Sequence, residues 1–62
     1  MNANKRKRLD AIIVLVEGLR DEEEQDLKDT PDNIEKSGVV AEQFNRNINH
    51  LNRALDNLRS AQ

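Results

Sequence analysis

The sequence predicts an all-α fold, an antiparallel two-helix hairpin that associates into a four-helix bundle or a larger helical oligomer. Apolar residues recur every three or four positions in both halves of the chain, which is the spacing of a helix face. A single proline near the middle separates the halves. Apolar and charged residues each make up 35% of the chain, a balance typical of long exposed helices. We expect one helical-hairpin domain over residues 1–62.

The first helix is predicted over about residues 4–29, after a basic N-terminus at 1–4 that would fray. Strong helix formers fill residues 20–28. The β-branched residues around position 13 favour a strand locally, but no second strand is available to pair with it. The predicted apolar face has a 3-4-3 spacing and is rejoined two turns later by Leu27; its members are Leu9, Ile12, Val16 and Leu19.

A turn-forming segment ends this helix, because Pro31 cannot continue it and disfavours helical geometry at Thr30. The same proline is compatible with a single helical turn through Ile34. We predict a connecting loop at 30–37. The hydroxyl of Ser37 is then expected to cap the second helix.

The second helix is predicted over about residues 38–60, where no proline interrupts the chain. Its apolar residues form a heptad seam with polar residues between them, and the members of this seam are Ala41, Phe44, Ile48, Leu51, Leu55 and Leu58. An antiparallel turn near residues 33 and 34 pairs residues whose numbers add up to about 67. The facing pairs are then Leu9 with Leu58, Ile12 with Leu55, Val16 with Leu51, and Leu19 with Ile48.

One hairpin is not expected to be stable alone, because a chain of this length buries only about 60% of its unfolded surface. The sequence has no cysteine and one histidine, so neither a disulfide nor a zinc centre can reinforce it. The first helix is also apolar away from its predicted face, at Ala11, Val14 and Leu15. We therefore predict that these three residues form an oligomer interface.

Glu23 is predicted to share in this interface, because it falls within the apolar face of the first helix. Its carboxylate would either reach past Phe44 to water or make a buried polar contact with Arg46 or Asn47 of a neighbouring chain. Single buried polar residues of this kind can specify how helices associate.

The net charge of −2 conceals a strong polarity along the chain. Four basic residues occupy positions 5–8, whereas eight acids and one lysine lie between residues 21 and 35. Both groups oppose the dipole of the first helix. In an antiparallel homodimer the acidic loop end of one hairpin would lie beside the basic end of the other, as two-fold symmetry allows. We predict such a dimer, or a higher oligomer, that weakens as salt rises.

The residues offer little for catalysis, and we expect neither an enzyme nor a cofactor or metal site. No serine stands beside an oriented base. Glu22, Asp26 and Asp29 share a helix face, but calcium-loop and di-metal spacings are missing. The longest apolar run has six residues, too few for a membrane span. We expect a cytoplasmic protein, in the host cytoplasm if it is phage-encoded.

Two sets of basic residues are candidate contacts for an anion or a partner. Arg46, His50 and Arg53 share a face of the second helix and would hold a small anionic ligand, such as a nucleotide, between subunits. Nucleic acid is the alternative for the N-terminal set, although no stacking aromatic or recognition motif accompanies it. That set consists of Lys5, Arg6, Lys7 and Arg8.

A run of acids closes the first helix and is followed by a spaced set of residues: Asp21-Glu22-Glu23-Glu24-Gln25, then Asp29, Pro31, Ile34 and Ser37, then Asn49, Leu51, Ala54, Leu55 and Leu58. In these features residues 20–58 resemble a group of short, poorly characterised helical-hairpin proteins of bacteria and phages. The resemblance implies a helical hairpin of phage or mobile-element origin and supplies no site residues.

The function expected from these observations is that of a non-enzymatic, homo-oligomeric interaction protein that binds another protein. A phage-encoded inhibitor or modulator of a host or defence protein would fit its size. The alternatives are a binder of a small anionic ligand and a nucleic-acid accessory protein.

Overall fold

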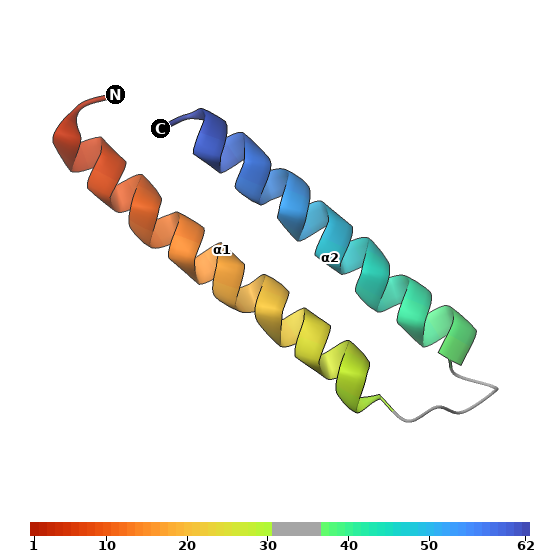
Figure 1. Cartoon of the computed structure of the whole chain (residues 1–62). Coiled ribbons are helices and arrows are strands. Elements are labelled where there is room, and N and C mark those ends of the chain that lie inside the picture. The colour runs from red at the N-terminus through yellow and green to blue at the C-terminus, as the bar shows by residue number, and fades with distance from the viewer. Residues whose placement is uncertain (31–36) are drawn as a thin grey trace.

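The computed structural model describes residues 1–30 and 37–62, with the side chain of Ser37 excepted. Two helices, α1 (Ala3–Asp29) and α2 (Ser37–Ser60), run antiparallel, and both chain ends lie at the same end of the hairpin (Figure 1). The all-α prediction is confirmed, and each helix begins one residue before its predicted start. The predictions for Pro31, Ile34 and the capping hydroxyl of Ser37 lie outside the described residues.

The ends of α1 are closed by side chains that satisfy free backbone groups. At the start, the Oδ1 atom of Asn2 accepts a hydrogen bond of 2.8 Å from the amide of Lys5. At the end, the hydroxyl of Thr30 donates to the carbonyl of Asp26 at 2.7 Å, and the Thr30 amide donates to the same carbonyl at 3.0 Å. An asparagine cap of this kind stabilises a helix by about 1 kcal/mol.

The core of the hairpin is small and lies toward the chain ends. Among the described residues, the buried apolar side chains are Leu9, Ile13 and Leu55, with Val16 and Leu58 packed against them. The Cα atoms span 51 × 16 × 8 Å, so the hairpin is a single layer of two helices. Within residues 1–30 and 37–62, no other element covers the outer sides of the two helices.

The apolar face that α1 turns toward α2 differs from the predicted one. Ile13 is 7% exposed, whereas Ile12 and Leu19 are 47% and 54% exposed. We call the inward-facing row of α1 the hairpin seam; it consists of Leu9, Ile13, Val16, Arg20, Glu23 and Leu27, all buried or half-buried. The prediction that Ile12 and Leu19 face α2 is therefore wrong, because the alternative heptad through Ile13 continues as far as Leu27.

Polar side chains also link the two helices. Leu9 and Leu58, which were predicted to face each other, lie in one apolar cluster, and among the described residues four side-chain hydrogen bonds join the two halves of the hairpin. The pairs are Arg20 with Asn52, Glu23 with Asn47, Glu17 with Arg59, and Asp10 with Gln62. Polar residues in the seam of α1 thus meet polar residues of α2, which the apolar pattern alone did not reveal.

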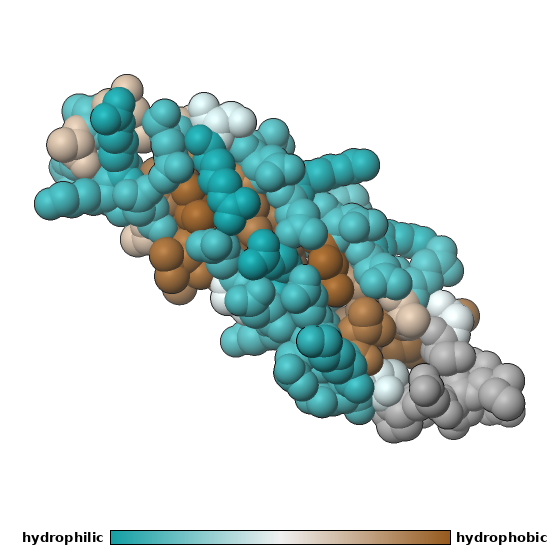
Figure 2. All heavy atoms as spheres, viewed as in Figure 1, coloured by the Kyte–Doolittle hydropathy of each residue, from teal (hydrophilic) through white to brown (hydrophobic). Residues whose placement is uncertain are grey.

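The hydropathy of the surface follows from this arrangement. In Figure 2, hydrophobic side chains run along the junction between the helices, and a further group projects from the edge of α1 away from α2. That group belongs to no core of the hairpin.

Candidate interaction surface

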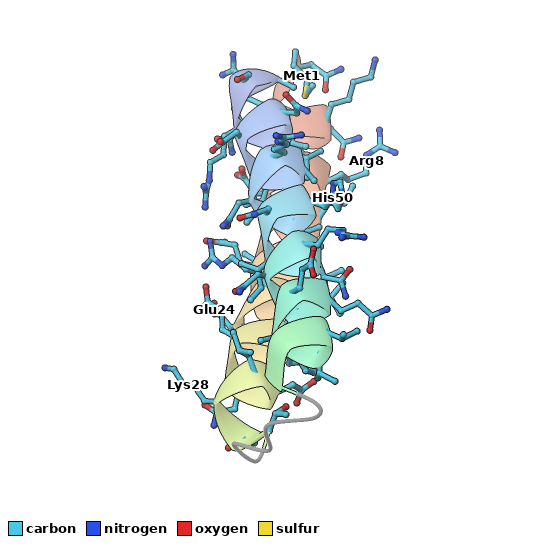
Figure 3. All side chains as sticks on the ribbon, turned by 90° about the vertical axis from the view of Figure 1, so that its right-hand side faces the viewer. Met1, Arg8, Glu24, Lys28 and His50 are labelled. Atoms are coloured by element: carbon cyan, nitrogen blue, oxygen red, sulfur yellow. The ribbon has the colours of Figure 1, made fainter. Side chains whose placement is uncertain are left out.

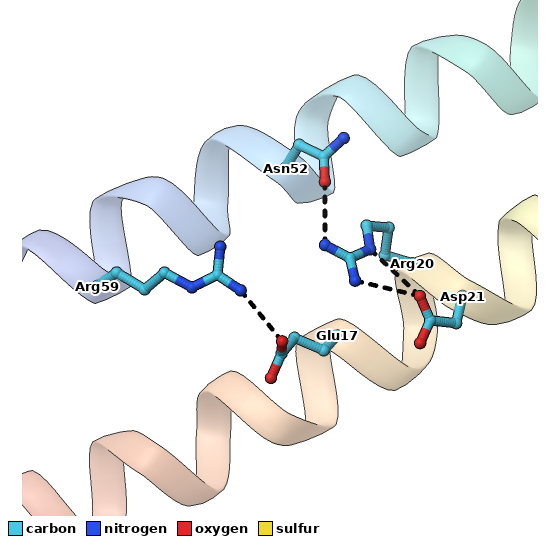
Figure 4. Close-up of polar contacts among 5 residues, drawn as sticks. All are labelled: Glu17, Arg20, Asp21, Asn52 and Arg59. Atoms are coloured by element: carbon cyan, nitrogen blue, oxygen red, sulfur yellow. Dashed lines mark hydrogen bonds and ion pairs between the residues drawn. The ribbon is translucent and has the colours of Figure 1, made fainter.

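One side of the hairpin is occupied by polar contacts within the chain. Arg59 donates to a carboxylate oxygen of Glu17 at 3.1 Å, and so ties the end of α2 to the middle of α1 (Figure 4). Arg20 donates to Asp21 at 3.2 Å and to the side-chain oxygen of Asn52 at 3.4 Å. Arg59, Glu17, Arg20 and Asp21 on this side therefore have polar partners within the chain.

The opposite side of α1 carries a second row of residues at heptad spacing. We call it the outer stripe, and it consists of Arg8, Ile12, Leu15, Leu19 and Glu22, flanked by Lys5 before it and Asp26 after it. All of these residues are exposed, and Leu15 at its centre is 70% exposed. At 3.6 residues per turn, the outer stripe lies about 100° around α1 from the hairpin seam. In a four-helix bundle a helix contacts two neighbours at about this angle.

The surface is hollowed at both ends of the outer stripe. An open groove of about 330 Å³ at the loop-proximal end is lined by Leu19, Glu22, Glu23 and Asp26 of α1 and by Asn47, His50 and Leu51 of α2. A second groove of the same volume at the other end is lined by Met1, Lys5, Arg8, Leu9 and Ile12. One groove is thus rich in carboxylates and the other in basic groups. Figure 3 shows Arg8 and His50 projecting from the same side of the hairpin, with Glu24 and Lys28 on the other.

Three of the four residues predicted as an oligomer interface are exposed on α1. Val14 is 64% exposed, and Ala11 and Leu15 are exposed beside it. They extend around the helix from the outer stripe, with Val14 farthest from its axis. The sequence interpretation missed Ile12 and Leu19 as surface residues. The signal that identifies them is a row of residues spaced four, three, four and three positions apart, parallel to the hairpin seam. This row runs through Arg8, Ile12, Leu15, Leu19 and Glu22.

Glu23 has a polar partner within its own chain. It is half-buried in the hairpin seam and accepts a hydrogen bond of 3.1 Å from the side-chain amide of Asn47. A neighbouring chain is therefore not needed to satisfy this carboxylate.

The basic residues at the start of α1 do not form one face. All four are exposed, and at about 100° per residue they point in four directions around the helix. Lys5 and Arg8 lie along the outer stripe, whereas Arg6 and Lys7 point elsewhere. Phosphate-binding surfaces concentrate basic residues on one face or along one stripe. This dispersal does not favour a nucleic-acid interface.

The three candidate anion contacts of α2 are also separated by their surroundings. Arg46 donates to Glu42 at 3.2 Å within the helix. His50 lines the groove that contains Glu22 and Asp26, where carboxylates would repel an anion. Arg53 is exposed on the outer side of α2. The three residues therefore do not converge on one anion site in a single hairpin.

Over residues 1–30 and 37–62, no three His, Cys, Asp or Glu side chains gather in a way that could hold a metal ion. Within the same residues, neither helix contains a stretch that is long and apolar enough to cross a bilayer. The sequence matches no family model, no curated protein and no solved structure.

Proposed function

We propose that this chain is a non-enzymatic helical interaction protein that works as a homo-oligomer through the outer stripe of α1. The observation that carries the proposal is the continuous exposure of Ile12, Leu15 and Leu19 on a helix whose other face is already used. Contiguous apolar patches on small proteins mark interaction sites. A hairpin with a core of three described residues also gains stability from a further contact.

The target of the assembled protein is proposed to be another protein. The resemblance to bacterial and phage hairpin proteins suggests a component of the host cell or of its defence against phages. The polar side of the hairpin and the outer side of α2, which association through the outer stripe leaves free, are the surfaces available to such a target.

The test of self-association is sedimentation of the wild-type chain and of Leu15→Gln over a range of concentrations. Glutamine keeps the helix propensity but removes an apolar side chain from the centre of the outer stripe. We expect the oligomer to dissociate at least about tenfold more readily in Leu15→Gln, since burying a leucine contributes about 1.5–3 kcal/mol. The wild-type oligomer should also weaken between 0.1 M and 1 M salt.

Val39→Gln is the matched control, because Val39 is 70% exposed like Leu15 but lies on α2. It should leave the oligomer unchanged. A wild-type chain that stays monomeric at every concentration would contradict the proposal. Tight binding of nucleic acid or of a nucleotide by that monomer would favour the alternative functions instead.

A further inference from the structure

The charges and apolar residues of the outer stripe are arranged symmetrically about Leu15. Arg8 lies seven residues before Leu15 and Glu22 lies seven residues after it. Farther out, Lys5 and Asp26 lie at nearly equal distances on the two sides. A row that is basic at one end, apolar in the middle and acidic at the other is complementary to itself only when reversed.

We infer that the partner of the outer stripe is α1 of a second copy of this chain, antiparallel to the first, with the two-fold axis beside Leu15. The inference rests on the proposed function and names its contact. Leu15 then meets the partner's Leu15, and Ile12 meets the partner's Leu19. Arg8 faces the partner's Glu22, and Lys5 faces the partner's Asp26. Each polar pair forms twice because the contact is isologous.

The two grooves, which the residues of the outer stripe help to line, agree with this arrangement. The groove lined by Glu22 and Asp26 and the groove lined by Lys5 and Arg8 lie at opposite ends of the same side of α1. Rotation about an axis beside Leu15 places the acidic groove of one copy over the basic groove of the other. A long basic side chain can then lie along Leu19 while its charged end reaches the carboxylates.

A parallel pairing of the same helices is disfavoured by the same charges. It would place Arg8 beside the partner's Arg8 and Glu22 beside the partner's Glu22. Like charges opposed across a helix interface are destabilising, and such repulsion selects the orientation of paired helices. Among the described residues, none of these charged groups is neutralised by an ion pair within its own chain. The apolar centre would supply affinity, and the charged ends would set direction.

The first experiment is a charge exchange followed by sedimentation equilibrium. Arg8→Glu or Glu22→Arg alone should weaken the dimer about tenfold, because each replaces two attractive contacts with two repulsive ones. The double variant Arg8→Glu with Glu22→Arg restores opposite charges across the interface. It should recover the wild-type dissociation constant to within about twofold.

Arg6→Glu, Glu24→Arg and their combination are the matched controls. They make the same changes of net charge close to Arg8 and Glu22 in the sequence, but at about 100° per residue both lie on the side of α1 away from the outer stripe. These variants should leave association within about twofold of wild type. Equal effects in both sets would mean that only net charge matters, and would overturn the inference.

The second experiment measures the direction of the helices by cross-linking. Because the chain has no cysteine, single-cysteine variants report one position at a time. Oxidised Leu15→Cys should form a covalent dimer, since the two Cα atoms face each other at the axis. Ile12→Cys should not, because antiparallel helices separate its two copies by about 10 Å along the axis.

The outcomes separate this inference from the proposed function. A wild-type monomer at all concentrations would reject both. A dimer that Leu15→Gln disrupts, but in which Ile12→Cys cross-links as readily as Leu15→Cys, would keep the proposed function and reject the antiparallel arrangement. A dimer that the charge exchange does not restore would likewise reject the pairing of Arg8 with the partner's Glu22.

Discussion

The two helices of this hairpin use their apolar residues in opposite ways. In α2 the apolar residues lie almost entirely on the side that faces α1, and Val39 is its one large hydrophobic residue among those most exposed in the described structure. In α1 they divide between the hairpin seam and the outer stripe, so that Ile12, Leu15 and Leu19 stay exposed beside a buried Ile13. This difference is the basis on which we propose a second helical partner for α1 and none for α2.

The largest loss of stability is expected from a substitution in the core that the two helices share. Leu55 is fully buried, so Leu55→Ala should destabilise the hairpin by about 3 kcal/mol through lost burial and the cavity left behind. In a chain with so small a core, this loss should lower the melting temperature sharply in a circular-dichroism scan at fixed concentration.

Leu58→Ala is the control for this prediction, because Leu58 is only partly buried against the same cluster. Its effect should be about half as large. If both variants melted like the wild type, helix α2 would not depend on a single apolar face, and the contrast between the helices would be lost.

A smaller change, a gain in stability, is expected when Glu23 is replaced by an apolar residue. Its half-buried position in the hairpin seam suits an apolar side chain, and Asn47 can turn its amide to water when the carboxylate is removed. Glu23→Leu should therefore raise the free energy of unfolding by about 1 kcal/mol. Denaturant titration measures this change, and sedimentation should show the same oligomer as the wild type.

Glu24→Leu is the neighbouring control, since Glu24 is exposed and lies outside the hairpin seam. It should give no comparable gain. A different oligomeric state in Glu23→Leu alone would assign this carboxylate to a contact between chains, and would move part of the interface from the outer stripe to the seam.

The smallest effect is expected on the polar side of the hairpin. The ion pair between Arg59 and Glu17 is 3.1 Å long, but the two side chains remain 45% and 36% exposed, so water screens it. Arg59→Ala should cost less than about 0.5 kcal/mol in unfolding and should leave the dimer dissociation constant unchanged. Arg53→Ala removes an equal charge from α2 without touching this pair, and a stronger effect of Arg59→Ala on association would place the interface on the polar side.

The helices and their ends were predictable because their signals are local. Pro31 marks the end of the first helix in the sequence, and the one apolar face of α2 permits a single choice of inward side. The inward side of α1 was not predictable in this way. Two heptads overlap there, one through Ile12 and one through Ile13, and both satisfy the spacing of a helix face.

The choice between these heptads depends on contacts with residues distant in the sequence. Arg20 and Glu23 occupy seam positions, and Asn52 and Asn47 on α2 form hydrogen bonds with them. Apolar spacing carries no information about such polar pairs, so the seam of α1 was misassigned. The charge polarity and the exposed residues Ala11, Val14 and Leu15 were evident from the sequence. The outer stripe from Arg8 to Glu22 could be recognised only once the inward-facing residues of α1 were known.

The position of the small core has a consequence for how the hairpin opens. Leu9, Ile13 and Leu55 anchor the end that carries the chain termini, whereas the turns next to the connection rely on half-buried residues such as Leu27 and Phe44. Local unfolding begins where the fewest apolar contacts must be broken. The connection end should therefore open and reclose while the terminal end stays paired. Glu22 and Asp26 lie toward the connection end, so the acidic half of the outer stripe should change shape more readily than the basic half.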